Sequence, residues 1–226
     1  MVVVSGRKMR VKPLPRYQCR RVIRYSPPIP TAAHRRAFDF NGNHIVIDFI
    51  NTVNGRPVYT RDDLATIDDI FEWASAAGMT RGDGQLRRTA GESTQFAAAV
   101  ALRESLYGVF GPVANGGSPE PCALEFVARR ASLATRSAQW VSLESSFVPR
   151  WPDGSLESIC DHLADAAIQL LRSPAVARVG SCAGCGWLFV DTSRGHARRW
   201  CSMNVCGVRD KMRRYHQRQT NQTSVT

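Results

Sequence analysis

The chain has 226 residues and a formal net charge of +11. Its apolar content is ordinary for a globular protein, and no stretch reaches the ~20 consecutive apolar residues of a membrane helix. The only apolar run at the start, Val2 to Val4, is too short for the apolar region of a secretory signal. We therefore expect a soluble, cytoplasmic protein and not a membrane or secreted one.

The positive charge is concentrated at the two ends of the chain. Residues 1–36 carry ten Lys and Arg and no acid, and residues 181–226 carry eight against two acids. Residues 37–180 hold twelve Lys and Arg against seventeen acids, which gives −5. An acidic body between two basic ends predicts a polyanionic partner, although solubility alone also explains such charge.

The first segment, residues 1–36, has five prolines among its basic residues and little apolar periodicity. It cannot bury enough surface to offset the entropy of ordering it, so we expect a disordered basic arm. The run "FDFNGNHIVIDFINTV" follows from Phe38. Its turn at Asn41–Asn43, followed by β-branched residues, predicts a short β-hairpin.

Helices dominate the rest of the body. Thr66 and Asp69 form a capping-box pattern, which predicts a helix over 67–77 that stops at Gly78. The remaining elements are a helix capped by Ser93 or Thr94 and running to Phe110, a loop over 111–119, a helix over 120–134 with Leu124, Val127, Ala131 and Leu133 inward, a strand-like stretch over 139–148 with a turn over 149–154, and a helix over 155–172. The predicted fold is mainly α with a short β-hairpin and strands, and a small C-terminal four-cysteine module.

Four of the seven cysteines form two close pairs, Cys182 with Cys185 and Cys201 with Cys206. Because a C-x2-C turn lets two thiolates reach one ion, two such pairs predict a closed tetrahedral site for one structural Zn²⁺. A redox or iron–sulfur centre and unrelated thiols are the alternatives. The other cysteines are scattered, and Cys122 and Cys160 are expected to be small buried hydrophobes.

Basic residues surround the cysteine pairs. His196 lies among arginines between the pairs, which favours an exposed basic loop over a metal ligand. A base-rich helix is expected after Cys206, either as a solvated face with Met212 and Tyr215 packed inward or as a helix on a phosphate backbone. The candidate nucleic-acid contacts are Arg194, Arg198, Arg199, Arg209, Lys211, Arg213 and Arg214.

The run "CAGCGWLFVDTSRGHARRWCSMNVCGVRDKMRRYHQR" resembles the CGNR zinc finger, a bacterial C-terminal module. The preceding "IDFINTV", "LATIDDIFEWASAAG" and "ALRESL" resemble the ABATE domain that usually precedes this finger. The resemblance implies a stress-induced transcription regulator whose finger binds DNA, with the four cysteines as metal ligands. The naming motif has Asn where this chain has Val208, so a contact made by that Asn is absent here.

We expect a basic arm over 1–36, a mostly helical ABATE-like domain over 37–178, a zinc finger with its basic helix over 179–220, and a tail over 221–226. The favoured function is DNA binding, with a body that senses a small-molecule effector or forms a homodimer. One alternative is a zinc-stabilised module that binds a partner protein. The chain is not predicted to be an enzyme, because no reacting constellation can be assembled, although a polar cluster forms a candidate ligand pocket. Its residues are Asp48, Asn51, Thr52 and Arg103.

Overall fold

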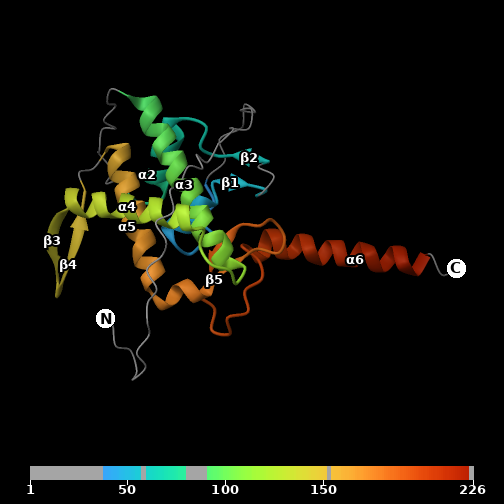
Figure 1. The fold of residues 1–226 in the computed structure, drawn as a ribbon. Helices are drawn as coiled ribbons and strands as arrows, with labels where there is room; N and C mark the ends of the chain where they lie inside the picture. Colours follow the sequence, from blue (N-terminus) through green and yellow to red (C-terminus); the bar gives the residue numbers. More distant parts are fainter. Residues whose placement is uncertain (1–37, 57–59, 80–90, 152–153, 224–226) are drawn as a thin grey trace, which may run out of the picture.

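The structure is a computed structural model that describes residues 38–56, 60–79, 91–151 and 154–223. The predicted arm over 1–36 lies outside these residues. The described chain is mainly helical with three small antiparallel two-stranded sheets, as predicted (Figure 1). Its elements are α1 (Ile45–Ile50), β1 (Val53–Asn54), β2 (Arg61–Asp62), α2 (Ile67–Ala76), α3 (Glu92–Ala114), α4 (Pro121–Ser137), β3 (Gln139–Leu143), β4 (Ser146–Arg150), α5 (Leu156–Arg172), η1 (Pro174–Arg178), β5 (Val179–Ser181), β6 (Leu188–Val190), the π-helical turn η2 (Met203–Gly207) and α6 (Val208–Thr223).

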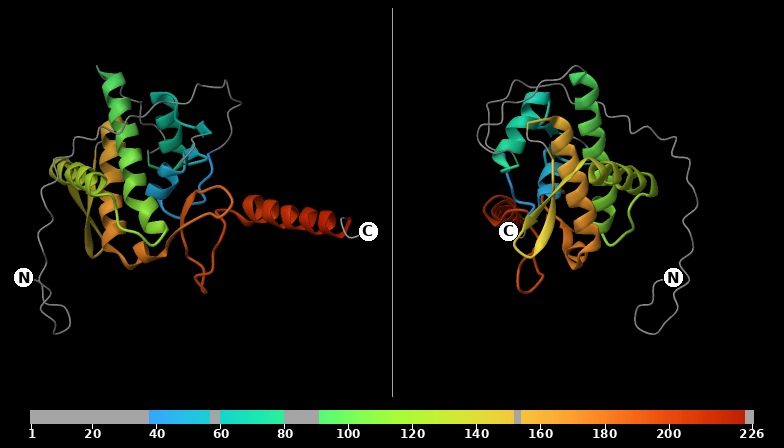
Figure 2. Two further views of the ribbon diagram at one scale, coloured as in Figure 1. Left: turned by 45° about the vertical axis from the view of Figure 1, so that its right-hand side comes forward. Right: turned by 90° about the vertical axis from the view of Figure 1, so that its left-hand side faces the viewer.

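The body is built around α3, which packs against α1, α4 and α5. Its core draws buried apolar side chains from α1 to α5, among which Trp73, Phe49 and Phe110 are the largest aromatic ones. Helix α6 lies outside this body and projects away from it, and the β3–β4 hairpin lies at the opposite end (Figure 2). Within the described residues, no helix combines the length and apolar character that crossing a bilayer requires.

The hairpin predicted from Phe38 onward is wrong. Residues Ile45–Ile50 form the short helix α1, whose first turn is capped by the His44 side chain accepting a hydrogen bond from the Val46 N–H. Every residue from Val46 to Ile50 is buried. A short apolar run that is buried on all sides carries no period that separates strand from helix, so its β-branched residues misled the prediction.

The capping box of α2 is confirmed. Thr66 Oγ1 accepts a hydrogen bond from the Asp69 N–H, and the Asp69 carboxylate accepts one from the Thr66 N–H. Gly78 follows the helix with a φ of +72°, a backbone conformation that glycine adopts at little cost. The helix predicted from Ser93 or Thr94 instead begins after Gly91, without a side-chain cap, and continues to Ala114.

The two remaining predicted helices are present, but one residue expected in the core is exposed. Helices α4 and α5 occupy nearly their expected spans, and Ser155 caps α5 through the Ser158 N–H. Leu133, expected to face inward, is 57% exposed on α4, whereas Ala134 beside it is buried. Residues 139–150 form not one strand followed by a turn but the β3–β4 hairpin, which turns at Glu144; residues 152–153 of the predicted turn lie outside the described residues.

The cysteines outside the pairs behave differently from one another. Cys160 is buried on α5 as a free thiol, as expected. Burial raises the pKa of that thiol to about 12, so it stays protonated. Cys122, in the first turn of α4, is half-buried and not fully buried as expected.

Candidate metal centre and nucleic-acid interface

The structure brings the four paired cysteines together. One sulfur atom from each lies within 4.8 Å of all the others. The Sγ atoms of Cys185 and Cys201 are 3.5 Å apart and those of Cys201 and Cys206 are 3.6 Å apart, too far for a disulfide at ~2.05 Å. Four thiolates at ~2.3 Å from one tetrahedral Zn²⁺ lie about 3.8 Å apart, so the cluster is consistent with one zinc ion.

The backbone around the first pair forms a tight turn. The Cys182 N–H donates to the Trp187 carbonyl at 2.7 Å, and the Gly186 N–H donates to the Cys182 carbonyl at 2.9 Å. Gly186 has a φ of +75°. A Cβ added to Gly184 would lie 3.2 Å from Cys206 Cβ, so glycine at this position allows the two halves of the module to approach closely.

Hydrogen bonds among the thiols shift their pKa values in opposite directions. The Cys201 thiol holds the pKa of Cys185 at about 5, and the same contact, together with burial, raises the pKa of Cys201. Burial is also the main reason why the pKa of Cys206 rises to about 11. Because thiols ligate as thiolates, a bound metal replaces the protons that these groups share.

Strand β6 lies between two cores because its side chains alternate. Leu188 and Val190 belong to the core of the body, whereas Phe189 packs with Cys182, Cys201 and Cys206. The other partly buried members of this second cluster are Cys185, Trp187 and Trp200.

Polar contacts hold the cysteine module against α1. The Asn51 side-chain amide donates to the Leu188 carbonyl and accepts from the Leu188 N–H, each at 2.9 Å. The Val190 N–H donates to the Gly42 carbonyl at 2.8 Å, and the Asn43 amide donates to the Val190 carbonyl at 3.0 Å. The loop before α1 therefore pairs with β6 along the strand's backbone.

The matches to known families agree with this division of the chain. The ABATE family model, described as "Putative stress-induced transcription regulator", matches residues 43–174, and the CGNR zinc finger model matches residues 178–219. The chain belongs to the ABATE family. It is an ABATE domain followed by a CGNR zinc finger. A search of curated proteins found no match.

Arg198, a predicted nucleic-acid contact, is engaged inside the protein. Its guanidinium donates to the carbonyls of Asn41, at 2.6 Å, and of Cys201, at 2.5 Å, and it lies 4.5 Å from the Phe189 ring centroid. Its backbone N–H donates to the Asp191 carboxylate at 3.0 Å. Arg198 therefore joins the finger to the ABATE body, and single-sequence reasoning had no signal for that role.

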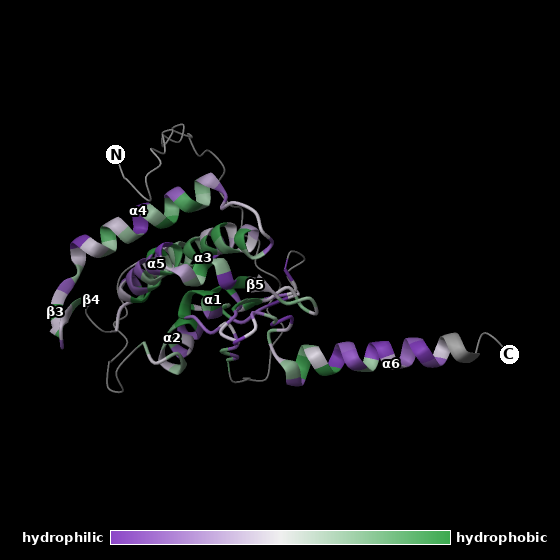
Figure 3. Cartoon of the chain, turned by 90° about the horizontal axis from the view of Figure 1, so that it is seen from below, coloured by the Kyte–Doolittle hydropathy of each residue, from purple (hydrophilic) through white to green (hydrophobic). Residues whose placement is uncertain are grey.

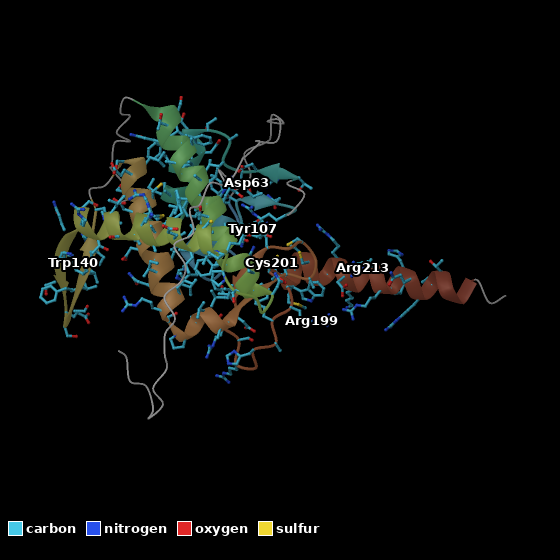
Figure 4. The ribbon with its side chains drawn as sticks, in the orientation of Figure 1. Asp63, Tyr107, Trp140, Arg199, Cys201 and Arg213 are labelled. Carbon is cyan, nitrogen blue, oxygen red and sulfur yellow. The ribbon has the colours of Figure 1, made fainter. Side chains whose placement is uncertain are left out.

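Asp191 anchors the basic loop of the CGNR finger. Its carboxylate accepts hydrogen bonds from the backbone N–H groups of Ser193 and Arg198. Contacts with Ser193, then with Arg198, hold the pKa of Asp191 at about 2. The loop carries three exposed basic side chains, Arg194, His196 and Arg199. Figure 4 labels Arg199. His196 has a φ of +48° and is not part of the thiol cluster.

Helix α6 starts immediately after Cys206-Gly207 and exposes its basic side chains. Arg209, Lys211, Arg213 and Arg214 are all exposed. The buried Asp210 carboxylate pairs with Arg213 and with Arg214, each at 2.5 Å, which directs both toward the finger end of the helix. Figure 3 shows that most of the projecting helix is hydrophilic.

An apolar stripe accompanies these cations on α6, and the sequence analysis missed it. Met212 and Tyr215, considered as inward-packing residues, are 49% and 56% exposed. Together with Val208, at the start of α6, they recur every three or four residues, which places them on one side of the helix. Val208, which replaces the Asn of the motif, is itself half exposed.

The candidate ligand pocket residues are all buried and bonded within the protein, Asn51 to the finger and the other three to the body. Asp48 Oδ1 accepts from the Gly42 N–H at 2.7 Å, and burial raises the pKa of Asp48 to about 6. Arg103 makes two bonds to Asp62, at 2.7 and 2.6 Å, and donates to Thr52 Oγ1. These contacts, with those of Asn51, give the four residues structural roles.

Proposed function

We propose that this protein is a zinc-dependent DNA-binding transcription regulator. One Zn²⁺ is held by Cys182, Cys185, Cys201 and Cys206, and DNA is contacted by the loop after β6 and by α6. The family supports a regulatory, non-enzymatic role. The observation that carries the proposal is that the thiol cluster leads directly into a projecting, base-rich helix.

The zinc site is proposed to be structural. Four thiolates complete a tetrahedral shell, so no position is open for substrate or activated water. The ion supplies folding energy to a module whose own core is the small cluster around Phe189. By fixing Cys201 and Cys206 it orients both the basic loop and the first turn of α6.

The DNA surface is proposed to comprise exposed cations on two adjacent elements. Arg194, Arg209 and Lys211 make no ion pair with any other described residue, so their charges are available to phosphates. Phosphate contacts of this kind supply affinity without sequence information. Arg198 is left out of this surface because its guanidinium is used between the finger and the body. The remaining members are Arg199, Arg213 and Arg214.

The salt dependence of binding to random duplex DNA tests this proposal. We expect the zinc-loaded full chain to bind with a steep fall in affinity as salt rises, because cations that contact phosphates release counterions. Arg209→Gln/Lys211→Gln should flatten the slope of log K against log salt by about 1.8, at ~0.9 per lost phosphate contact.

A matched control removes the same charge from the other end of the molecule. Arg129 and Arg150 are exposed on α4 and β4, so Arg129→Gln/Arg150→Gln lowers the net charge equally. Its slope should equal that of the unmodified chain. An unchanged slope in the α6 variant, or an equal change in the control, would exclude α6 as the DNA-contacting element.

A second candidate function is docking of a partner protein on the finger. The observation in its favour is the exposed apolar stripe that includes Met212 and Tyr215 on α6. Exposed apolar residues at this spacing suit an amphipathic groove on another protein. Met212→Gln/Tyr215→Gln discriminates the two, because it should leave the salt slope of DNA binding unchanged but abolish an apolar docking contact.

A further inference from the structure

The β3–β4 hairpin projects from the body with large apolar side chains exposed. Phe147 is 72% exposed, and Trp140 and Leu143 are each 56% exposed. Figure 4 places Trp140 at the end of the molecule opposite Arg213 of α6. Within the described residues, the hairpin makes no extensive contact with another helix or strand. A two-stranded hairpin on its own is at best marginally stable in water, so pairing with a further strand would stabilise this element.

The register of the hairpin determines which backbone edge is open. Leu143 is opposite Ser146 across the two-residue loop, and residues opposite each other alternate between hydrogen-bonded and non-bonded pairs from there. The hydrogen-bonded pairs are therefore those that Leu143, Val141 and Gln139 form with their partners on β4. The backbone groups of Trp140 and Ser142 consequently point away from β4, along the outer edge of β3.

The outer edge of β4 is blocked, whereas that of β3 is not. Pro149 is opposite Trp140 in a non-hydrogen-bonded pair, so its backbone faces the outer edge of β4. Because proline has no N–H, it cannot donate a hydrogen bond along that edge. Proline at such a position protects an edge strand from pairing. The N–H groups of Trp140 and Ser142 on β3 make no hydrogen bond with any other described residue outside the hairpin.

Charge favours a second copy of the chain as the occupant of this edge. Residues 139–150 contain one acid, Glu144, and one base, Arg150, in a chain of net charge +11. Two such hairpins meet without repulsion. The stripe on α6, in contrast, is flanked by Arg209, Lys211 and Arg214, so two copies of that helix would bring like charges together.

We propose that β3 pairs antiparallel with β3 of a second copy about a two-fold axis at Val141, which forms a four-stranded sheet. In this register each Trp140 is opposite Ser142 of the other copy, and their outward N–H and C=O groups form four hydrogen bonds. The two Trp140 side chains become diagonal neighbours on one face, within reach of each other. The proposal does not depend on DNA binding, because the hairpin and α6 lie at opposite ends of the molecule (Figure 1).

The mass of the purified full chain in solution tests the dimer. Light scattering after size exclusion should give twice the chain mass of 25.0 kDa, with dissociation on dilution. Ser142→Pro removes an N–H that points outward and leaves the bonds within the hairpin intact, so it should weaken association at least tenfold. Ser142→Ala keeps that N–H and should associate as the unmodified chain does. A chain that is monomeric at every concentration would overturn the proposal, as would equal association of these two variants.

A cross-link tests the register without depending on the proline variant. Non-bonded pairs in an antiparallel ladder have Cα atoms about 4.5 Å apart, which suits a disulfide. Val141→Cys should therefore yield a covalent dimer on oxidation, which reductant reverses. Glu144→Cys, in the loop and away from the axis, is the control and should yield far less. Equal yields from both, or none from Val141→Cys, would contradict this register.

Discussion

The ABATE body and the CGNR finger are stabilised in different ways. The body has a continuous apolar core to which α1 to α5 all contribute. The buried core of the finger is Phe189 with Cys182, Cys201 and Cys206, so three of its four buried members are thiols. An element of this size rarely folds by apolar burial alone. The finger is therefore held by its cysteine cluster on one side of β6 and by the body on the other.

Removing the metal should give the largest difference between the two regions. Chelation, or Cys201→Ser, should cost the finger roughly 10–16 kcal/mol of apparent metal-binding energy and unfold residues 179–207. The body should stay folded because its core contains none of these thiols. Hydrogen exchange measured along the chain checks this, with α3 amides as the internal control. Equal loss of protection in α3 would contradict the comparison.

Breaking the buried ion pair of the body should have the opposite effect to removing the metal: it should destabilise the body and leave zinc binding by the finger unchanged. Arg103 is 0% exposed and its guanidinium bonds the buried carboxylates of Asp62 and Glu104, so Arg103→Leu removes a buried cation from both and should cost about 3–5 kcal/mol. Urea unfolding measures this cost, and zinc stoichiometry should remain one per chain. The double variant Arg103→Leu/Asp62→Leu removes both charges and should recover part of the loss. If the double variant is less stable than the single one, the loss has another cause.

The pH dependence of stability should report on Asp48, at the contact between the two regions. Burial raises its pKa in the folded state from 3.8 to about 6. A raised folded pKa gives a stabilising contribution that is complete below pH ~4 and is lost as pH rises through 6. At 1.36 kcal/mol per pKa unit the loss is about 3 kcal/mol. Asp48→Asn lacks this loss, so its unfolding free energy relative to the unmodified chain should increase between pH 4 and 7. A constant difference across this range would refute the shift.

Asn51→Ala should weaken the attachment of the finger to the body. It leaves the Leu188 N–H and C=O without their buried partner and should cost about 2 kcal/mol in urea unfolding. Amides of β5 and β6 should exchange faster, while those of α5 should not. Asn204→Ala, the same substitution at an exposed position of η2 in the finger, is the matched control and should have little effect. Identical exchange in both variants would show that Asn51 does not hold the finger.

The smallest expected effect lies in the body alone. Thr66→Ala removes the side-chain half of the α2 capping box and should cost about 1 kcal/mol. Zinc stoichiometry and the exchange of β6 amides should be unchanged, since α2 is not part of the finger contact. Faster exchange of β6 in this variant would mean that the two regions unfold together.

Local patterns predicted much of the fold because their causes are local. The α2 capping box depends on two residues three positions apart, and α5 shows strong helical periodicity up to Ser173-Pro174. Where local signals were absent or conflicting, the prediction was wrong. The buried run Ile45–Ile50 reads equally well as strand or helix, and Leu133 lies one residue from the buried Ala134.

Residue types and their spacing were enough to predict the chemistry of the C-terminal module: four thiols at metal-ligand spacing, followed by a basic helix. Such features depend on residue type and short spacing, which are visible without a structure. The folded chain was needed to show that Arg198 and Asn51 join the finger to the body and that β3 has an open edge. The contacts of Asn51 with Leu188 and of Arg198 with Asn41 span 137 and 157 positions, and no local pattern reports on partners brought together from that distance.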